Sequence, residues 1–401
     1  MKLTGGQIVA KALKANGVGY VAGMSGEGSW ALVDALLTTG TDIPFIQVIQ
    51  EQNAVHLADG YFRACGRPMA VLLPVPLAVS KALGAMATAL ADSSAMLVIS
   101  GGSAGHWPET MPPGVSKEHV RVSAIEQLPQ ALRQSFDTMF NSRLGPVSLS
   151  IPTAVQNTSI EVSLPPATLR ANSDLQRTDS RLAECAAGSM LGADRPATVK
   201  DRASCPIKDS ANDAPPLMVQ RPLTELKSVL ERDAIVVVGA GSIQTVVREV
   251  FPADQSRCHL CATSVGTVGW AVPAAIGAKL AMPARQVVCA VGDGDFLQSM
   301  QEMAVCVMHS LPVVFLVFNN SGYVSLSDVQ DSLNEQHRAG EFNLPDGKPY
   351  SPDFASIARN FGLEAWRVEH ASQLNPAFIK ALNSKGPSLV EVITARSSRV
   401  N

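Results

Sequence analysis

The sequence has few aromatic residues and little charge for a chain of 401 residues. Aromatic side chains make up 5% of it and charged side chains 17%, and the formal net charge is −3. A balance this close to neutral disfavours nucleic acid or an anionic membrane surface as a partner. The N-terminus lacks an apolar signal core, and no uninterrupted apolar stretch is long enough to span a bilayer. We therefore expect a cytoplasmic protein with no membrane or nucleic-acid partner.

The sequence also lacks paired cysteine motifs. Its seven cysteines are odd in number and mostly lie in apolar runs, which indicates reduced, packed thiols rather than disulfides. Cys258 and Cys261 form a single CxxC motif with no second pair, so a zinc or redox site is disfavoured there.

Aromatic residues are absent from Asn141 to Val250, and residues 158–217 are rich in Ser, Asp, Ala, Arg and Pro with little apolar periodicity. A segment that cannot bury much apolar surface is predicted to be a linker rather than a domain. It separates two regions that each alternate strand and helix patterns. We predict domains at 1–157 and 218–401, joined by residues 158–217.

Both regions contain short, almost entirely apolar runs between amphipathic segments, which is typical of a parallel sheet covered by helices on both faces. The predicted fold class is therefore α/β, with two doubly wound parallel-sheet domains. The predicted strands are 18–21, 45–48, 69–73, 95–100, 234–238, 287–291, 313–318 and 388–394. The predicted helices are 3–16, 29–37, 51–64, 80–90, 223–230, 270–280, 296–308 and 354–361.

Two polar motifs follow neighbouring strand patterns in the second region. Gly292-Asp293-Gly294 closes one apolar run, and Asn319-Asn320 closes the next. Either motif alone is most simply an ordinary turn or strand exit. Together they would deliver hard oxygen ligands to one edge of a parallel sheet, which is a suitable arrangement for Mg²⁺ against a diphosphate.

At this spacing the two motifs resemble the signature of thiamin diphosphate (ThDP) enzymes. The resemblance covers most of residues 1–155 and 220–395, and is closest to the acetolactate synthase and pyruvate decarboxylase group. That group normally inserts a complete α/β domain between the other two, the one that carries FAD in some members. About sixty residues cannot build such a domain, so FAD is unlikely and the chain resembles a reduced two-domain version.

The resemblance implies a role for Glu51, which opens the segment Glu51–Arg63 and matches the start of a family helix. A carboxylic acid there protonates the aminopyrimidine ring of the cofactor and so promotes deprotonation of the thiazolium carbon. Seen alone, a Glu in the first turn of a helix is also favourable for the helix dipole. Beside the other motifs, the activating role is the better interpretation.

The resemblance also implies a set of cofactor and metal contacts in the second region. The Gly266 carbonyl would accept a hydrogen bond from the exocyclic amine, and the Val268 side chain would hold the bent cofactor. The implied diphosphate contacts are Gly241, Ser242, Gly292, Gly294, Asp295 and Phe296, and the implied Mg²⁺ ligands are Asp293, Asn320 and the Gly322 carbonyl, of which the last two also count as cofactor contacts.

The substrate side departs from the family. Glu27 stands where pyruvate decarboxylases have an acid and acetolactate synthases a Gly, so it is a candidate catalytic proton relay, although a solvated loop residue is equally consistent. Residues 73–81 replace the usual SGPGxxN loop with a segment that contains two prolines. Gly102 stands where acetolactate synthases have a Gln, and His106 is a candidate compensating polar group or a surface residue.

From this resemblance we expect ThDP- and Mg²⁺-dependent cleavage of a 2-oxo acid, with ligation of the product to a second carbonyl compound, an aldehyde or ketone. Simple decarboxylation to an aldehyde is the first alternative. A non-catalytic partner subunit or regulator that keeps the cofactor fold is the second. Because the family places the Glu51-type residue on one subunit and the diphosphate on its neighbour, a homodimer or a dimer of dimers is implied, with sites at the interface.

Overall fold

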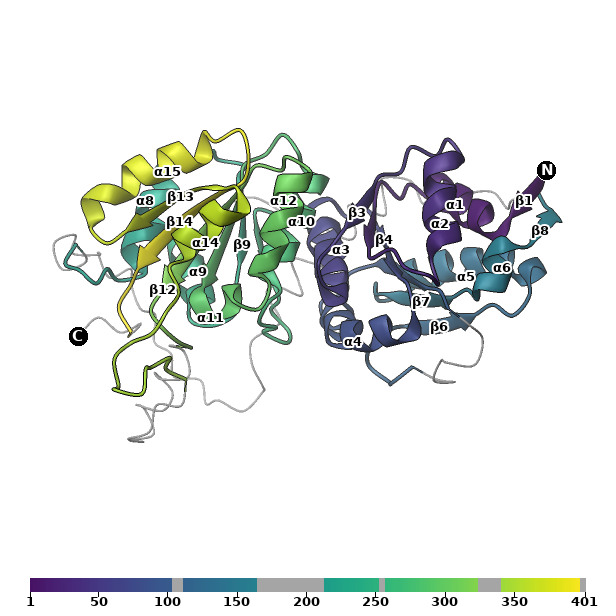
Figure 1. Cartoon of the computed structure of the whole chain (residues 1–401), viewed down its shortest axis with the longest axis horizontal. Coiled ribbons are helices and arrows are strands. Elements are labelled where there is room, and N and C mark those ends of the chain that lie inside the picture. The colour runs from purple at the N-terminus through teal and green to yellow at the C-terminus, as the bar shows by residue number, and fades with distance from the viewer. Residues whose placement is uncertain (103–110, 164–212, 252–256, 324–339, 397–401) are drawn as a thin grey trace.

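Two six-stranded parallel sheets, each covered by helices, form the two ends of the molecule (Figure 1). The computed structural model describes residues 1–102, 111–163, 213–251, 257–323 and 340–396. The predicted linker therefore lies largely outside the described residues, as does His106. Two doubly wound α/β domains were predicted, and this fold is confirmed.

The N-terminal sheet has the strand order β3-β2-β4-β5-β7-β6, and every neighbouring pair in it is parallel. A separate antiparallel pair joins the first and last strands of this region. The strands are β1 (Lys2–Thr4), β2 (Val21–Gly23), β3 (Phe45–Gln47), β4 (Met69–Leu73), β5 (Met96–Ser100), β6 (Glu118–Arg121), β7 (Val147–Ser150) and β8 (Ser159–Glu161). The helices are α1 (Gly5–Ala15), α2 (Trp30–Thr38), α3 (Glu51–Cys65), α4 (Pro76–Ala91), the short 3-10 helix η1 (Ile125–Gln127), α5 (Leu128–Phe140) and α6 (Thr153–Asn157).

The C-terminal sheet has the strand order β10-β9-β11-β12-β14-β13 and is also parallel throughout. Its strands are β9 (Ile235–Val238), β10 (His259–Cys261), β11 (Val287–Gly292), β12 (Val313–Asn319), β13 (Glu364–Val368) and β14 (Ser388–Ile393). Its helices are α8 (Gln220–Val229), α9 (Ile243–Val250), α10 (Ala271–Ala281), α11 (Asp293–Phe296), η3 (Met300–Glu302), α12 (Met303–Met308), α14 (Phe354–Phe361), η4 (Ala371–Gln373) and α15 (Leu374–Leu382).

The central strands form because their apolar runs can be buried on both faces. All residues of β4, β5, β9 and β12 are buried, as expected for a parallel sheet between helix layers. Helix α1 begins at a capping box, in which the Thr4 hydroxyl accepts from the Gln7 amide and the Gln7 side chain accepts from the Thr4 amide.

Two predicted helices are wrong in their extent. The helix predicted at 80–90 begins four residues earlier, since α4 starts at Pro76, and the first position of a helix tolerates a proline. Residues 296–308 are not one helix, because the chain forms α11, then η3, then α12. Ser299 lies between them with φ −143° and ψ 11°, which is not a helical conformation. The domain boundary at residue 157 stays a prediction, although β8, just beyond it, pairs with β1 of the N-terminal domain.

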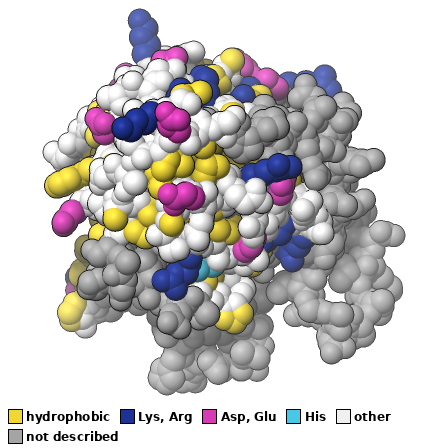
Figure 2. Space-filling view, turned by 90° about the vertical axis from the view of Figure 1, so that its right-hand side faces the viewer, with side chains coloured by type: hydrophobic (Ala, Val, Ile, Leu, Met, Phe, Trp, Pro, Cys, Tyr) yellow, Lys and Arg dark blue, Asp and Glu magenta, His cyan; other side chains and the backbone are white. Residues whose placement is uncertain are grey.

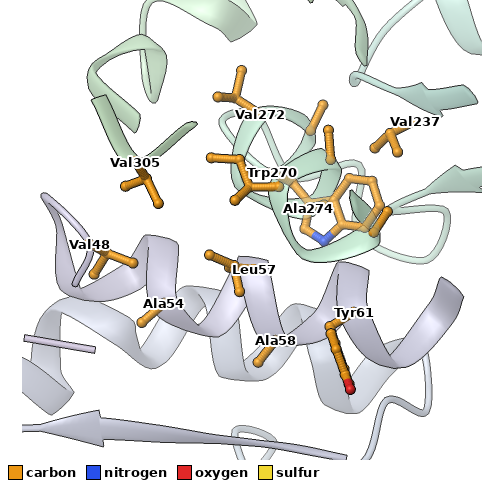
Figure 3. Packing of buried hydrophobic residues seen from close by; sticks show 14 of the residues in the cluster. Val48, Ala54, Leu57, Ala58, Tyr61, Val237, Trp270, Val272, Ala274 and Val305 are labelled. Atoms are coloured by element: carbon orange, nitrogen blue, oxygen red, sulfur yellow. The ribbon is translucent and has the colours of Figure 1, made fainter. Parts of the chain in front are cut away.

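Helices α3 and α10 bring the two domains together. They run antiparallel, since Gly60 lies against Ala274 while Leu57 lies against Gly277. Figure 3 shows apolar side chains around this contact, with Leu57 on α3 pointing toward the helix that carries Ala274. Added methyl groups at the two glycines would fall 2.1 Å and 1.9 Å from backbone oxygens of the facing helix, so the helix backbones touch.

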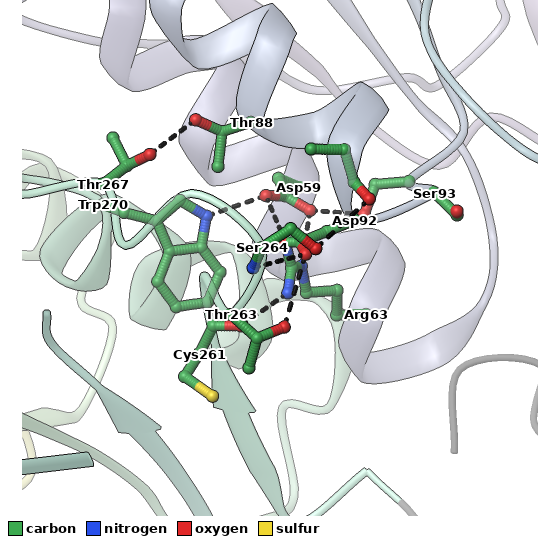
Figure 4. A network of polar contacts seen from close by, with 12 residues as sticks. Asp59, Arg63, Thr88, Asp92, Ser93, Cys261, Thr263, Ser264, Thr267 and Trp270 are labelled. Carbon is green, nitrogen blue, oxygen red and sulfur yellow. Dashed lines mark hydrogen bonds and ion pairs between the residues drawn. The ribbon is translucent and has the colours of Figure 1, made fainter. Parts of the chain in front are cut away.

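A buried polar network holds the same junction at the C-terminal half of α3 (Figure 4). Asp59 accepts from Arg63 at 2.6 Å and from the Trp270 indole at 2.7 Å. Arg63 also donates to Asp92 at 2.7 Å and to the Cys261 carbonyl at 2.7 Å. Every charged group here has an opposite partner, as a buried charge requires.

The surface carries no broad charge field on the described part of the face in Figure 2, where acidic and basic side chains are interspersed. In the described ranges, every helix is too short or too polar to serve as a bilayer crossing.

Candidate active site

A pocket lies at the carboxyl ends of β9, β11 and β12, where the loops that follow these strands converge. Among the described residues, its lining comes entirely from the C-terminal domain. Nine of the predicted cofactor residues line it: Gly241, Ser242, Gly266, Val268, Gly292, Gly294, Asp295, Asn320 and Gly322. The edge formed by strand carboxyl ends is where open α/β sheets bind ligands.

Asp293 lies at the start of α11, directly after β11, and is 1% exposed. Its carboxylate accepts from the Gly294 amide at 2.8 Å and the Gly322 amide at 3.2 Å. Burial raises the pKa of Asp293 to about 6, although these backbone hydrogen bonds oppose the rise. Among the described residues its hydrogen-bond partners are backbone amides, so this buried carboxylate is a natural ligand for a divalent cation, which would supply an opposite charge.

Asn320 faces the same pocket and has an unused hydrogen-bond acceptor. Its Oδ1 is buried and has no partner in the part of the chain that the structure describes. Buried polar atoms are rarely left unpaired in folded proteins. No three His, Cys, Asp or Glu side chains in the described ranges are grouped to hold a metal, so a cation here would rely on Asp293, Asn320 and backbone oxygens. This donor set is all oxygen, which suits Mg²⁺.

The space beside Gly266 is open. This glycine has φ +66°, a backbone conformation that favours glycine, and a methyl group added to it would meet no atom within 4 Å. Val268 lines the pocket two residues further on. The segment therefore presents backbone groups to the pocket at close range, as the predicted cofactor contact requires.

Asp295 lines the pocket, but its side chain also ties two loops together. Its carboxylate accepts from the Ala240 amide at 2.7 Å and from the Gly269 amide. Burial raises the pKa of Asp295 to about 6, against these two hydrogen bonds. Its side chain thus joins the loop after β9 to the segment before α10. Phe296, predicted as a backbone contact, packs its ring in the core against Phe315 and Phe354.

Glu51 lies away from this pocket. It begins α3 at the end opposite the buried network, and its carboxylate accepts from Lys81 Nζ at 3.0 Å and 3.2 Å. A helix rises about 1.5 Å per residue. Glu51 is therefore roughly 13 Å along α3 from Gly60, which contacts the middle of α10. Within one chain the structure does not bring Glu51 together with Gly266 and Val268.

Glu27 is exposed in the loop between β2 and α2. The next residue fixes this loop, since the Gly28 carbonyl accepts from the Gln156 side chain at 2.8 Å. A methyl group on Gly28 would lie 1.9 Å from the Pro74 carbonyl oxygen, so this loop packs against the segment that replaces SGPGxxN. Glu27 thus lies in a loop that packs against this segment, and its role stays a prediction, while His106 lies outside the described residues.

Several contributors were not predicted from the sequence, and three of them bear on the chemistry. Lys81 pairs with Glu51, Tyr323 lines the pocket, and Glu302 contacts the start of α3 from the C-terminal domain. Local sequence patterns cannot predict the hydrogen bonds of Glu302, because its partners lie about 250 positions earlier in the chain. The only signal for Tyr323 was its place directly after the predicted ligand Gly322.

Comparisons with known proteins agree with this geometry. The family profile "Thiamine pyrophosphate enzyme, N-terminal TPP binding domain" matches residues 3–115, and "Thiamine pyrophosphate enzyme, C-terminal TPP binding domain" matches residues 239–392. Together the two profiles cover well over half of the chain.

Among curated proteins, the chain is 29% identical over 205 residues to a probable acetolactate synthase large subunit of Methanococcus aeolicus, covering 50% of this chain and 33% of that protein. It is 32% identical over 177 residues to a chloroplastic acetolactate synthase 2 of Zea mays, covering 44% of this chain and 28% of that one. The matched regions thus span about a third of these relatives. A solved benzoylformate decarboxylase from Polynucleobacter necessarius has the same fold, with a TM-score of 0.82 at 18% identity over 99% of this chain and 100% of that one.

Proposed function

The chain belongs to the thiamine pyrophosphate enzyme family, and from this premise we propose that it cleaves a 2-oxo acid with ThDP and Mg²⁺ and ligates the product to a second carbonyl compound. The observation that carries the proposal is that buried Asp293 lies between the pocket residues Gly292 and Gly294 and beside Asn320, whose buried Oδ1 has no partner among the described residues. The side-chain oxygens of both residues are the hard ligands that Mg²⁺ prefers, and the cation would in turn neutralise a diphosphate.

The described residues fit the cofactor and the metal. Asp293, Asn320 and the Gly322 carbonyl would hold Mg²⁺, while the loops at Gly241–Ser242 and Gly292–Gly294 would face the diphosphate. Gly266 and Val268 would meet the aminopyrimidine and thiazolium rings. When bound, ThDP supplies a carbanion that adds to the carbonyl carbon of the substrate. FAD is not part of the proposal, and a cytoplasmic location stays a prediction.

Glu51 would donate the activating proton, and its position supports a homodimer. Because Glu51 and the pocket lie at opposite ends of the α3–α10 pair, one chain cannot place this carboxylate on its own cofactor without rearrangement. A second copy that presents its Glu51 to the pocket would complete the site, and two-fold symmetry would create two such sites.

Simple decarboxylation is the second candidate outcome, and Glu27 is the residue that favours it. A carboxyl group beside the substrate loop could protonate the reacting carbon and so release an aldehyde before a second carbonyl compound reacts. The matched acetolactate synthases favour ligation instead. The non-catalytic alternative is opposed by the presence of Glu51, Asp293 and Asn320 together.

Turnover tests the proposal. Purified protein with ThDP and Mg²⁺ is incubated with a panel of 2-oxo acids, alone and with aldehydes, and CO₂ and new C–C bonds are measured. We expect CO₂ release with at least one 2-oxo acid and an acyloin product when an acceptor is present. An aldehyde as the sole organic product would select the decarboxylase alternative. If the protein bound ThDP but converted no compound of the panel, both the proposed carboligation and the alternative decarboxylation would be contradicted.

A further inference from the structure

Glu302 of the C-terminal domain reaches across the domain junction to the beginning of α3. Glu302 lies in η3, nine positions after Asp293, and is fully buried. Its Oε1 accepts from the Asn53 side chain at 2.8 Å and from the Gln50 amide at 3.1 Å. Both of its carboxylate oxygens lie 3.2 Å from the Ile49 amide.

One of these contacts caps the helix, since the Gln50 amide is among the first amides of α3, while the other contacts hold the preceding Ile49 amide and the Asn53 side chain. The first amides of a helix have no partner within the helix and need an acceptor. The N-cap residue of α3 is Gln50, and its own side chain makes no capping hydrogen bond. The Glu302 carboxylate takes this place from another domain, and its negative charge also suits the positive end of the helix dipole.

The residue that follows Gln50 is Glu51. Fixing the amides of residues 49 and 50 therefore fixes the backbone from which the Glu51 side chain projects. The Glu51 side chain is 11% exposed and pairs with Lys81, whose side chain is 59% exposed. An ion pair with a largely exposed lysine orients a carboxylate only weakly, so the backbone at the start of α3 matters more for its direction.

We infer that Glu302 is a positioning residue, which holds the start of α3 so that Glu51 projects at the angle needed for cofactor activation. This inference rests on the proposed function. It makes the placement of Glu51 depend on the docking of the two domains of one chain, because the acceptor belongs to one domain and the helix to the other. Burial raises the pKa of Glu302, and its hydrogen bonds from Asn53, Ile49 and Gln50 oppose that rise.

Amide hydrogen exchange in the cofactor-free protein tests the cap directly. In Glu302→Ala, we expect exchange of residues 49–53 to speed up by about tenfold, since lost caps and unsatisfied buried donors each cost on the order of 1 kcal/mol. Strand β5 should keep its protection. The matched control is Gln301→Ala, which removes only an exposed contact from Gln301 to the Gln50 side chain at 3.2 Å. Unchanged exchange at 49–53 in Glu302→Ala would overturn the inference.

The thiazolium proton then reports on positioning. At saturating ThDP and Mg²⁺, Glu302→Ala should exchange this proton at least about tenfold more slowly than wild type, with its affinity for ThDP kept within about twofold. Glu302→Gln retains the shape of the side chain and one acceptor oxygen, so its rate of thiazolium proton exchange should lie between those of wild type and Glu302→Ala. This variant also replaces Glu302→Ala in the test if the alanine variant does not fold. Normal exchange of the thiazolium proton in both variants would refute a positioning role. If wild-type protein failed to bind ThDP, the proposed function would fail, while the amide measurement would still decide on the cap.

Discussion

His56 is a neutral imidazole in the middle of the helix that Glu51 begins. It is 3% exposed, and its Nδ1 has no hydrogen-bond partner within the described residues. Burial lowers the pKa of His56 to about 4, while Asp59 raises it and Arg63 lowers it by smaller amounts. A buried neutral histidine lowers the free energy of unfolding at any pH at which the same histidine in the unfolded chain binds a proton.

The pH dependence of stability follows from this shift. Between about pH 6.5 and pH 4 the unfolded chain binds a proton at His56 and the folded chain does not, so the free energy of unfolding falls as the pH falls through this window. The size is at most about 3 kcal/mol, at 1.36 kcal/mol per pKa unit. In His56→Leu this part of the fall should vanish in urea titrations at pH 7 and pH 4. The same substitution at exposed His309 should change the pH dependence of the free energy of unfolding far less. If this free energy fell equally with pH in wild type and His56→Leu, the assignment to His56 would be wrong.

Single residues also show how far the sequence could predict the site. Asp293, Asn320 and Gly266 belong to short motifs at strand ends or helix starts, so their neighbourhood in the chain was sufficient to single them out, and Asn320 and Gly266 line the pocket. The hydrogen bonds of Glu302 and the ties of Asp295 to Ala240 could not be predicted, because they depend on how distant loops pack. A local sequence pattern can identify a candidate site residue, but it cannot identify the distant residues that orient its side chain.

At the scale of elements, the same reasoning explains which strands were predicted. The central strands have continuous apolar runs because helices cover both faces, and their bounds were predicted to within about three residues. Strand β7 was missed although it is interior and buried, because its run Val147–Ser150 alternates Val and Leu with Ser and is not continuously apolar. Edge strand β10 was missed as well, and so were the edge strands β6 and β13. The residues of β6 and β13 are mainly half-buried or exposed, so neither of these two strands produces a continuous apolar run.

The contact between α3 and α10 gives an element-scale prediction. A methyl group on Gly277 would lie 1.9 Å from the Leu57 carbonyl oxygen, and neither helix backbone can yield without moving its domain. We expect Gly277→Ala to lower the free energy of unfolding by about 1 to 3 kcal/mol through overpacking, measured by urea denaturation. The control is Gly84→Ala on α4, where an added methyl group meets nothing within 4 Å and helix propensity should add up to about 1 kcal/mol. Equal stability of Gly277→Ala and wild type would mean that the two helices are not in contact.

At the scale of the whole molecule, the two domains dock through one end of the α3–α10 pair with a buried polar network and through the other with the Glu302 cap. This rigid junction keeps Glu51 and the pocket of one chain apart. The sequence resemblance implied a dimer, but periodicity and motifs could not tell where a single chain places its own carboxylate. That separation follows only from the antiparallel packing of two helices that are about 200 residues apart in sequence.

Mixing two inactive variants tests whether the site forms between two copies. Glu51→Gln should bind ThDP yet lose thiazolium exchange, and Asp293→Ala should lose Mg²⁺-dependent ThDP binding, so neither should turn over alone. After the two are unfolded together and refolded as a mixture, half of the dimers should contain one of each. Each mixed dimer would hold one site with both native residues, so activity should return to about a quarter of wild type, as two-fold symmetry requires. Each variant refolded alone is the control. Mass spectrometry should show that mixed dimers form. If the mixture nevertheless stays as inactive as its components, Glu51 and Asp293 of the same chain would belong to one site, which would refute a site shared between two copies.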